Sequence, residues 1–244
     1  MAGVQQVEGL VAGTVPLSAV DGPGNRFVVF LQGCGFDCLA CHNPATIPAR
    51  PRGAVPTPVS DVVDLVAADA VFLTGVTVTG GEPTAQPRFL AALLEGLAAD
   101  PLTAHLTRFV DTNGDVEASF WDDLAPVLDG AMVDLKALDT ERHIVLTGTD
   151  NYRVLASVSR LAALGLLHEV RLLLVPGLND ADADLDRTAH WLLALDPAVR
   201  VRVNGFGHHG TRAVARDLLA VTDDDRARYR RVLTAAGVRD LAGC

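Results

Sequence analysis

The chain has 244 residues, a formal net charge of −10 and an apolar content of 49%. This length suffices for one sizeable hydrophobic core, so we expect a single domain over residues 1–244. The acidic charge argues against a nucleic-acid partner, and no apolar run approaches the roughly 18 residues that span a membrane. The first residues carry Glu8 and no basic start, which is not typical of a signal peptide, so we expect a cytoplasmic protein.

Short apolar runs alternate with longer helical patterns six times along the chain. The expected strands are Phe27–Gln32, Val76–Thr79, Arg108–Val110, Ala131–Leu135, Val170–Val175 and Val199–Val203. The expected helices are Ser60–Ala70, Arg88–Ala99, Val116–Leu128, Tyr152–Leu164, Ala181–Leu195 and Asp224–Ala236. Ser60, Asp115 and Asn151 are candidates for helix N-caps. Gly165 and Gly237 are typical of the position just after a helix.

Six strand and helix pairs with apolar strands predict an α/β fold, a parallel sheet covered by helices and curled into a partial barrel. A polar motif follows each expected strand. In chain order these are the run GCGFDCLACHNP, GGEP, DTNG, Asp134 with Lys136, VPGLND and FGHHG. Catalytic groups of barrels gather at the carboxyl ends of the strands, so we expect these motifs to meet at one end of the barrel.

Three cysteines, Cys34, Cys38 and Cys41, lie within eight residues directly after the first expected strand. Three thiolates in a CxxxCxxC loop can hold a [4Fe–4S] cluster and leave one iron open to another ligand. Zinc could instead bind the three thiolates together with His42, although zinc sites usually pair CxxC knuckles. Disulfides would need an oxidising compartment, and the remaining cysteine, Cys244, ends the chain.

The sequence around the cysteines favours the iron–sulfur interpretation. It reads VDGPGNRFVVFLQGC up to Cys34 and continues after the third cysteine as HNP. Further motifs follow in order, namely TGGEP at 79–83, DTNG at 111–114, MVDLK at 132–136, LTG at 146–148 and VRLLLVPGLND at 170–180. In this combination the chain resembles the activating enzymes of glycyl radical enzymes, a branch of the radical SAM superfamily, over about three quarters of its length.

This resemblance implies a (β/α)6 partial barrel of the radical SAM type and a single [4Fe–4S] cluster held by Cys34, Cys38 and Cys41. Only about 38 residues separate Cys41 from Gly80, and they contain no cysteine, so we expect no ferredoxin-like insert. The family binds S-adenosylmethionine (SAM) through its amino and carboxylate groups at the open iron. In this family, reductive cleavage of SAM gives methionine and a 5′-deoxyadenosyl radical under anaerobic conditions.

The resemblance also implies how the chain would bind SAM. Gly80 and Gly81 suit a close backbone approach to the methionine amino group, and Glu82 can accept hydrogen bonds. Lys136 would meet the carboxylate or the ribose. A monovalent cation beside that carboxylate would be bound by Asp111, Thr112, Asp134 and the carbonyl of Met132. If these roles do not hold, Asp111 caps a turn and Asp134 pairs with an arginine.

Other residues are expected near the cofactor or the substrate. His42 and Asn43 follow the last cysteine and would order the cluster loop or border the path of the radical, or else form a turn. Asp21 matches the family position that holds the glycine-bearing loop of the partner, and Arg171 is a weaker candidate for the same task. His208 and His209 follow the last strand, where a relative has a histidine near SAM.

One position departs from the family pattern. The residue before the last cluster cysteine is usually bulky and abuts the adenine, but here it is Ala40. We therefore expect other groups to contact the adenine, for example the backbone near Val175 to Leu178.

The sequence predicts an oxidoreductase whose protein substrate is a glycyl radical enzyme and whose electron donor is a flavodoxin or a ferredoxin. The VDGPGNR run favours the pyruvate formate-lyase type of partner over anaerobic ribonucleotide reductase, whose activase is the first alternative. A radical SAM enzyme acting on a small molecule, such as a deazaguanine synthase, is the second alternative. A zinc-binding module without catalysis would leave GGEP, DTNG and MVDLK unexplained.

Overall fold

The computed structural model describes residues 6–243. The chain divides into two compact units. The first unit comprises residues 6–35, Ala45–Thr112 and Ser119–Ala131, and the second comprises Phe36–Pro44, Asn113–Ala118 and residues 132–243. No helix among the described residues is long and apolar enough to cross a membrane.

The first unit contains four neighbouring strands in the order β2-β3-β5-β6 and a separate short antiparallel pair, β1 with β4. The strands β3, β5 and β6 are parallel, while β2 runs antiparallel to β3. The strands are β1 Glu8–Gly9, β2 Val11–Ser18, β3 Arg26–Leu31, β4 Thr57–Pro58, β5 Gly75–Gly80 and β6 Thr107–Thr112. The helices are α1 Val59–Asp69, α2 Pro87–Ala99 and α3 Phe120–Leu124, with 3-10 turns at Pro44–Thr46, Ala70–Phe72, Pro83–Ala85 and Ala125–Val127.

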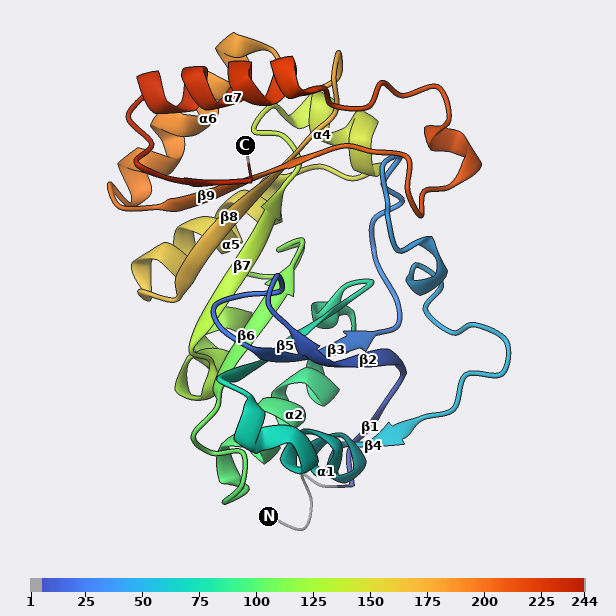
Figure 1. Cartoon of the computed structure of the whole chain (residues 1–244). Helices are drawn as coiled ribbons and strands as arrows, with labels where there is room; N and C mark the ends of the chain where they lie inside the picture. The colour runs from blue at the N-terminus through green and yellow to red at the C-terminus, as the bar shows by residue number, and fades with distance from the viewer. Residues whose placement is uncertain (1–5, 244) are drawn as a thin grey trace. The chain divides into compact units, whose positions relative to one another are not determined.

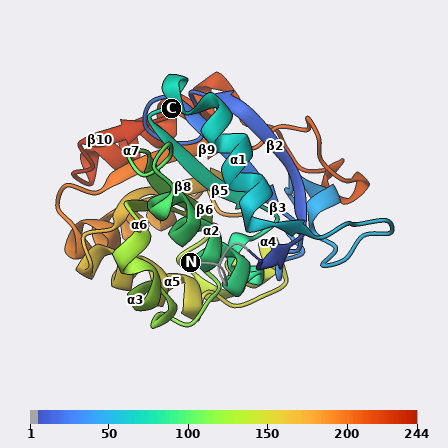
Figure 2. The ribbon, with the colours of Figure 1, turned by 90° about the horizontal axis from the view of Figure 1, so that it is seen from below.

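Strand β5 of the first unit separates an apolar face from a polar one. Side chains alternate between the faces of a strand, so Val76 and Val78, both 0% exposed, point away from Thr77 and Thr79. Helices α1 and α2 lie on the same side of β5 and β6 in views from the front and from below (Figures 1 and 2). The threonine face is therefore available for polar groups.

A fully buried arginine joins three strands of this unit. Arg26 begins β3, and its guanidinium lies 4.4 Å from the ring centroid of Phe109. Its nitrogens donate hydrogen bonds to Thr77 Oγ1, the carbonyls of Pro23, Val76 and Thr107, and Thr107 Oγ1, at 2.5–3.2 Å. Burial lowers the pKa of Arg26 to about 10. These bonds fix the turn of the VDGPGNR motif to β5 and β6.

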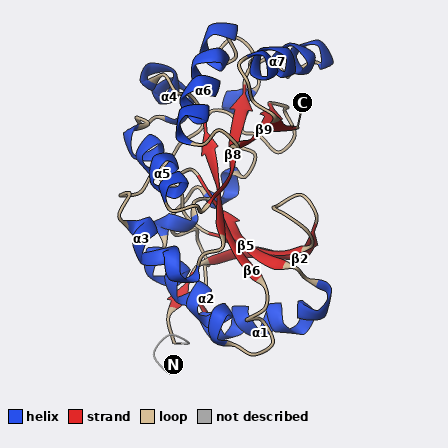
Figure 3. Ribbon diagram, turned by 90° about the vertical axis from the view of Figure 1, so that its left-hand side faces the viewer, coloured by secondary structure: helices blue, strands red, loops and turns tan. Residues whose placement is uncertain are grey.

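The second unit contains the strands β7-β8-β9-β10 in chain order, and the pairs β8–β9 and β9–β10 are parallel. Figure 3 shows α5 and α6 on the same side of β8. The strands are β7 Gly130–Leu135, whose first two residues belong to the first unit, β8 Leu167–Leu174, β9 Arg200–Gly205 and β10 Asp240–Ala242. The helices are α4 Thr140–Thr147, α5 Tyr152–Ala163, α6 Asp182–Leu195 and α7 Asp223–Ala235, with a 3-10 turn at Ala213–Ala215.

All six expected strands are present, and five of the six expected helices begin and end within about two residues of the prediction. The prediction of a helix over Val116–Leu128 is wrong, because α3 covers only Phe120–Leu124. Pro126 lacks an N–H and restricts the residue before it, which ends the helix at this point. The sequence did not predict β2, the short strands β1, β4 and β10, or helix α4.

Two of the three expected N-caps are wrong. Pro58 occupies the N-cap position of α1, and Ser60 donates its hydroxyl to Asp61 inside the helix. Asp115 lies before α3, whose N-cap position is Ser119. Asn151 does precede α5, but its amide bonds to the loop after β7 and does not cap the helix. Gly165 and Gly237 follow α5 and α7 with φ angles of 69° and 108°, as expected.

Candidate functional site

The three cysteines follow β3, all three are half-buried, and no disulfide joins them to one another. The loop that carries them is anchored at its start within the first unit. The N–H of Gly33 donates to Thr46 O at 2.8 Å, and the N–H of Cys34 donates to Ile47 O at 3.1 Å. The chain segment after the cysteines therefore holds the backbone of the first cysteine.

The second part of the loop, Phe36–Pro44, belongs to the second unit and is held by α4. The N–H groups of Asp37 and Leu39 each donate at 2.9 Å, to Thr147 O and Leu146 O respectively. These are C-terminal carbonyls of α4, which have no partner inside a helix. The LTG motif thus supplies acceptors for the backbone between Cys34 and Cys41.

The thiol of Cys38 lies beside the lysine that the sequence singled out. Burial raises the pKa of Cys38, and the cationic Lys136 acts in the opposite direction. A small cavity of about 10 Å³ lies in the second unit between these two residues and apolar side chains. Its lining consists of Cys38, Ala40, Lys136, Leu146, Leu173 and Val175. Lys136 is therefore close enough to the loop to influence the charge state of one of its thiols.

The two glycines of GGEP have a packing requirement of their own. A Cβ on Gly80, whose φ is +127°, would lie 2.2 Å from the backbone N and O of Leu31. A Cβ on Gly81 would lie 2.3 Å from Gly33 O and 2.5 Å from Thr46 O. Both positions therefore need glycine to pack β5 against the start of the cysteine loop.

Glu82 is a buried carboxylate with bonds to its own unit. It is 3% exposed, and its backbone N–H donates to Gly33 O at 2.7 Å. Its Oε1 accepts from the N–H and the hydroxyl of Thr84 and, at 2.6 Å, from the hydroxyl of Thr112. Thr112 ends β6, where Asp111 accepts a long 3.5 Å bond from Thr79. The carboxyl ends of β5 and β6 thus carry a connected set of polar groups.

Asp134 and Lys136 end strand β7 as a close ion pair, with 2.6 Å between Oδ2 and Nζ. The lysine takes the place of the arginine that the sequence analysis considered for Asp134. The backbone of Lys136 is fixed as well, because Asn179 Nδ2 donates to its carbonyl at 2.6 Å and to Leu173 O at 2.7 Å. The VPGLND motif therefore supports the chain around Lys136.

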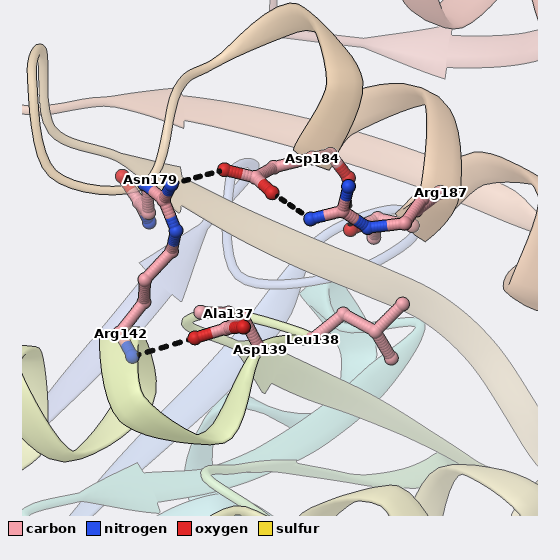
Figure 4. Close-up of a pocket in the computed structure, with 8 residues that line it drawn as sticks. Ala137, Leu138, Asp139, Arg142, Asn179, Asp184 and Arg187 are labelled. Carbon is pink, nitrogen blue, oxygen red and sulfur yellow. Dashed lines mark hydrogen bonds and ion pairs between the residues drawn. The ribbon is translucent and has the colours of Figure 1, made fainter.

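A hollow of about 160 Å³ next to this loop is lined by Arg142, Arg187 and Asp184, among others (Figure 4). Asp184 pairs with both arginines, and Arg142 also donates to Leu178 O at 2.8 Å. These charged groups join α4 to α6 and to the loop after β8.

The FGHHG segment after β9 contacts the end of the cysteine loop. His42 Nε2 lies 3.0 Å from Gly207 O, and the rings of His42 and His208 lie 6.0 Å and 5.2 Å from that of Phe206. His209 is exposed in the same turn, and Asn43 is exposed next to His42. The structure therefore brings both His42 and His208 next to the ring of Phe206.

Asp21 and Arg171 lie on different units. The carboxylate of Asp21 accepts from Ser18 Oγ at 2.5 Å, and its carbonyl accepts from Thr77 Oγ1 at 2.6 Å, on the polar face of β5. Arg171 is 7% exposed on β8 and pairs with Glu169 at 2.9 Å. It also donates to Met132 Sδ at 2.9 Å. Both residues therefore have fixed orientations.

Ala40 is 2% exposed in an apolar cluster. Its neighbours in that cluster are Leu146, Val175, Phe206 and Ala215, with Ala137, Leu173, Leu178 and Leu218 at the edge. The small side chain thus fills a position in the core of the second unit, between two cysteines of the loop.

Sequence analysis missed Arg212, which lies on the segment after FGHHG. Its guanidinium donates to Asp37 and to the carbonyl of Cys38. An arginine two residues after Gly210 has no motif of its own, so no sequence signal could have identified it.

The donor set of the cysteine loop fits an iron–sulfur cluster. Thiolates are the ligands of such clusters, and three cysteines within eight residues, none joined to another by a disulfide, supply them. Over residues 6–243 no group of three His, Cys, Asp or Glu side chains is arranged around a single metal ion. Cys244 lies outside the described residues.

The chain is similar to known proteins over most of its length. Residues 28–192 match the family model described as "Radical SAM superfamily". The chain is 35% identical over 207 residues to the pyruvate formate-lyase-activating enzyme of Streptococcus mutans, covering 82% of this chain and 78% of that enzyme. It is 31% identical over 231 residues to the enzyme of the same name from Staphylococcus aureus strain USA300, covering 88% and 92%. A solved domain of a pyruvate-formate lyase-activating enzyme from Bacteroides vulgatus superposes with a TM-score of 0.57 at 22% identity, over 69% of this chain and 99% of that domain.

Proposed function

Because the chain belongs to the radical SAM superfamily, we propose that it activates a glycyl radical enzyme of the pyruvate formate-lyase type. The observation that carries this proposal is the 31–35% identity to pyruvate formate-lyase-activating enzymes over most of both chains. The cysteine loop follows β3, GGEP and DTNG begin at the last residues of β5 and β6, and MVDLK lies at the end of β7.

Cys34, Cys38 and Cys41 would hold one [4Fe–4S] cluster, and SAM would bind at its open iron. When bound, the cluster and SAM supply a one-electron reductive cleavage and a carbon radical that abstracts hydrogen from a glycine Cα. The residues of the chain position these groups and exclude water. The buried backbone contacts of Gly33, Gly80 and Gly81 give the loop and the end of β5 one fixed arrangement, which limits misplacement of the reacting atoms.

The charged groups have separate proposed roles. Lys136 would bind the carboxylate or ribose of SAM, and Glu82 with its threonine partners would accept from the amino group. The Asp134 carboxylate is 31% exposed and pairs with Lys136, which keeps the ammonium group oriented until a second anion arrives. His42, Asn43, His208 and His209 would border the cofactor.

Three features of the proposal concern a cation, the protein substrate and the electron donor. A monovalent cation would be bound by Asp111, Thr112, Asp134 and the carbonyl of Met132, since carboxylate and carbonyl oxygens suit hard cations. Asp21 and Arg171 would hold the glycine-bearing loop of the partner. A flavodoxin or a ferredoxin in the cytoplasm would supply the electron.

The proposal is tested with the anaerobically reconstituted, dithionite-reduced protein and SAM. We expect release of methionine and 5′-deoxyadenosine and, with a pyruvate formate-lyase added, the EPR doublet of a glycyl radical. SAM cleavage without a radical on any glycyl radical enzyme would instead favour a small-molecule substrate. A radical only on anaerobic ribonucleotide reductase would reassign the partner.

A further inference from the structure

The segment 206–216 after β9 contacts the cysteine loop at two places. At one end, His42 Nε2 lies 3.0 Å from Gly207 O, and a Cβ on Gly210 would lie 3.0 Å from His42 O. At the other end, Arg212 reaches the residues before and at the second cysteine. Its Nη2 lies 2.7 Å from Cys38 O and 3.2 Å from Asp37 O, and its Nη1 lies 2.5 Å from Asp37 Oδ1. One guanidinium therefore binds two consecutive backbone carbonyls.

The backbone around Cys38 has little internal support. Residues 36–43 form no helix or strand, and the internal hydrogen bond from Cys41 N to Cys38 O is long, at 3.3 Å. The N–H groups of Asp37 and Leu39 bond to the end of α4. Arg212 binds the carbonyl groups of the same stretch from the other element. The peptide groups on either side of Cys38 are thus fixed from two sides, and the direction of its Sγ depends on both.

We propose that Arg212 is a positioning residue that orients Cys38 as a cluster ligand. This inference rests on the proposed function, because it requires the cluster. The Asp37 carboxylate is 73% exposed, so its ion pair with Arg212 contributes little by itself. The two bonds to the backbone carbonyls are the contacts that matter for Cys38, and partners of metal ligands typically change metal affinity by about 10- to 100-fold.

The geometry also explains why arginine is needed. A guanidinium presents donors in a planar fork and can bond the carboxylate and both carbonyls together, whereas an ammonium group is a single point. Arg212→Lys should therefore retain the charge and part of the bonding, and Arg212→Met should retain only the packing of the stem. Asp37→Asn is the matched control, because it removes the exposed ion pair and leaves both carbonyl bonds in place.

The experiment measures cluster loss from the reconstituted protein in EDTA, by the decay of its visible absorbance, and the midpoint potential by EPR-monitored titration. We expect Arg212→Met to lose its cluster about 10- to 100-fold faster than wild type, Arg212→Lys to fall between them, and Asp37→Asn to match wild type. The potential of Arg212→Met should shift downwards, because the Asp37 carboxylate is left uncompensated.

The double variant Arg212→Met with Asp37→Asn separates charge from position. It should regain the wild-type potential but still lose the cluster quickly. Wild-type retention in Arg212→Met, or restored retention in the double variant, would overturn the inference. Melting of the cluster-free proteins shows whether each variant folds, and Arg212→Lys serves if Arg212→Met does not. Wild-type protein that takes up no iron would refute the proposed function itself, whereas variants that behave like an iron-loaded wild type would refute only the role of Arg212.

Discussion

Lys136 is the only lysine among 244 residues, and the structure places it at the end of β7 beside Asp134 and Cys38. Its side chain is 12% exposed, and its backbone is fixed by Asn179. A charged donor in such a fixed setting suits recognition of a carboxylate, because little side-chain entropy remains to be lost on binding.

We expect Lys136→Ala to weaken SAM binding by about 10- to 100-fold, the effect of losing one charge-assisted hydrogen bond, with the iron content unchanged. Equilibrium dialysis of reconstituted protein measures this loss. Since the chain has one lysine, reductive ¹³C-methylation should give a single side-chain NMR signal besides that of the amino terminus. That signal should move when SAM is added, and SAM affinity equal to that of wild type would remove Lys136 from the site.

Asp21 allows substrate recognition to be separated from cofactor chemistry. Its turn is held through its carbonyl by Thr77, so Asp21→Ala should leave the turn in place. We expect this variant to cleave SAM at the wild-type rate but to lose most glycyl-radical formation on the partner, since hydrogen abstraction tolerates little misplacement of the glycine. EPR of the partner together with the yield of 5′-deoxyadenosine measures both quantities. The exposed Asp217→Ala is the control, and equal radical yields from Asp21→Ala and wild type would count against this role.

His143 on α4 couples the stability of the protein to pH. It is 0% exposed, its Nδ1 bonds to Thr149 O at 2.8 Å, and its Nε2 is buried without a hydrogen-bond partner among the described residues. Burial lowers the pKa of His143 below its usual value. Below about pH 6.5 the unfolded chain therefore binds a proton that the folded chain does not, and stability falls with pH until the lower folded pKa is passed.

We expect His143→Asn, which can still donate to Thr149 O, to flatten this part of the stability curve between about pH 7 and 5. Each unit by which the pKa is lowered corresponds to about 1.4 kcal/mol of lost stability. Urea unfolding at several pH values measures the difference from wild type. The exposed His105→Asn should change nothing, and a curve for His143→Asn parallel to that of wild type would contradict the assignment.

At the scale of single elements, the sequence predicted the strands and helices whose hydrophobic residues follow a regular local period. The six apolar strands and the helices with clear period were found because burial on one face imposes that period. Helix α4 was missed because its sequence, TERHIVLT, lacks a strong apolar stripe and its role is to offer end carbonyls to the cysteine loop. Strand β2 was missed because its residues are mostly exposed at a sheet edge.

The junction of β5 with the cysteine loop gives a prediction at this scale. Gly81→Ala should destabilise even the cofactor-free protein by about 1–3 kcal/mol, because the new methyl group would overlap the carbonyls of Gly33 and Thr46. Gly13→Ala on β2 is the matched control, since a Cβ there has no atom within 4 Å and should leave the melting temperature unchanged. If only SAM binding suffers in Gly81→Ala, the glycine serves the cofactor and not the packing.

At the scale of the whole molecule, the sequence motifs predicted which residues lie at the site, but they did not predict the contacts that hold those residues in place. The cysteines and Lys136 follow β3 and β7, GGEP begins at the last residue of β5, and Asp111 lies within the last residues of β6. The contacts that hold them, such as Asn179 on Lys136 and Arg212 on Cys38, join residues 43 and 174 positions apart. Such pairs follow from the tertiary fold and leave no local pattern in the sequence.

The number of clusters is also a property of the whole chain. We expect about four irons and four sulfides per chain after anaerobic reconstitution, from one cluster with three thiolate ligands. Cys244→Ser should leave this ratio unchanged, while Cys41→Ser should abolish stable binding. Iron and sulfide assays together with Mössbauer spectra check both variants. Stoichiometric zinc, or a large loss of iron in Cys244→Ser, would contradict the three-cysteine assignment.

The buried guanidinium of Arg26 affects how rigid the VDGPG turn is when a partner protein binds. One of its five hydrogen bonds goes to the carbonyl of Pro23 in the VDGPG turn and the other four go to β5 and β6, so opening the turn would leave one donor of Arg26 unpaired. A docking peptide would meet a surface already in its final conformation, and no part of its binding free energy would be lost to ordering that surface.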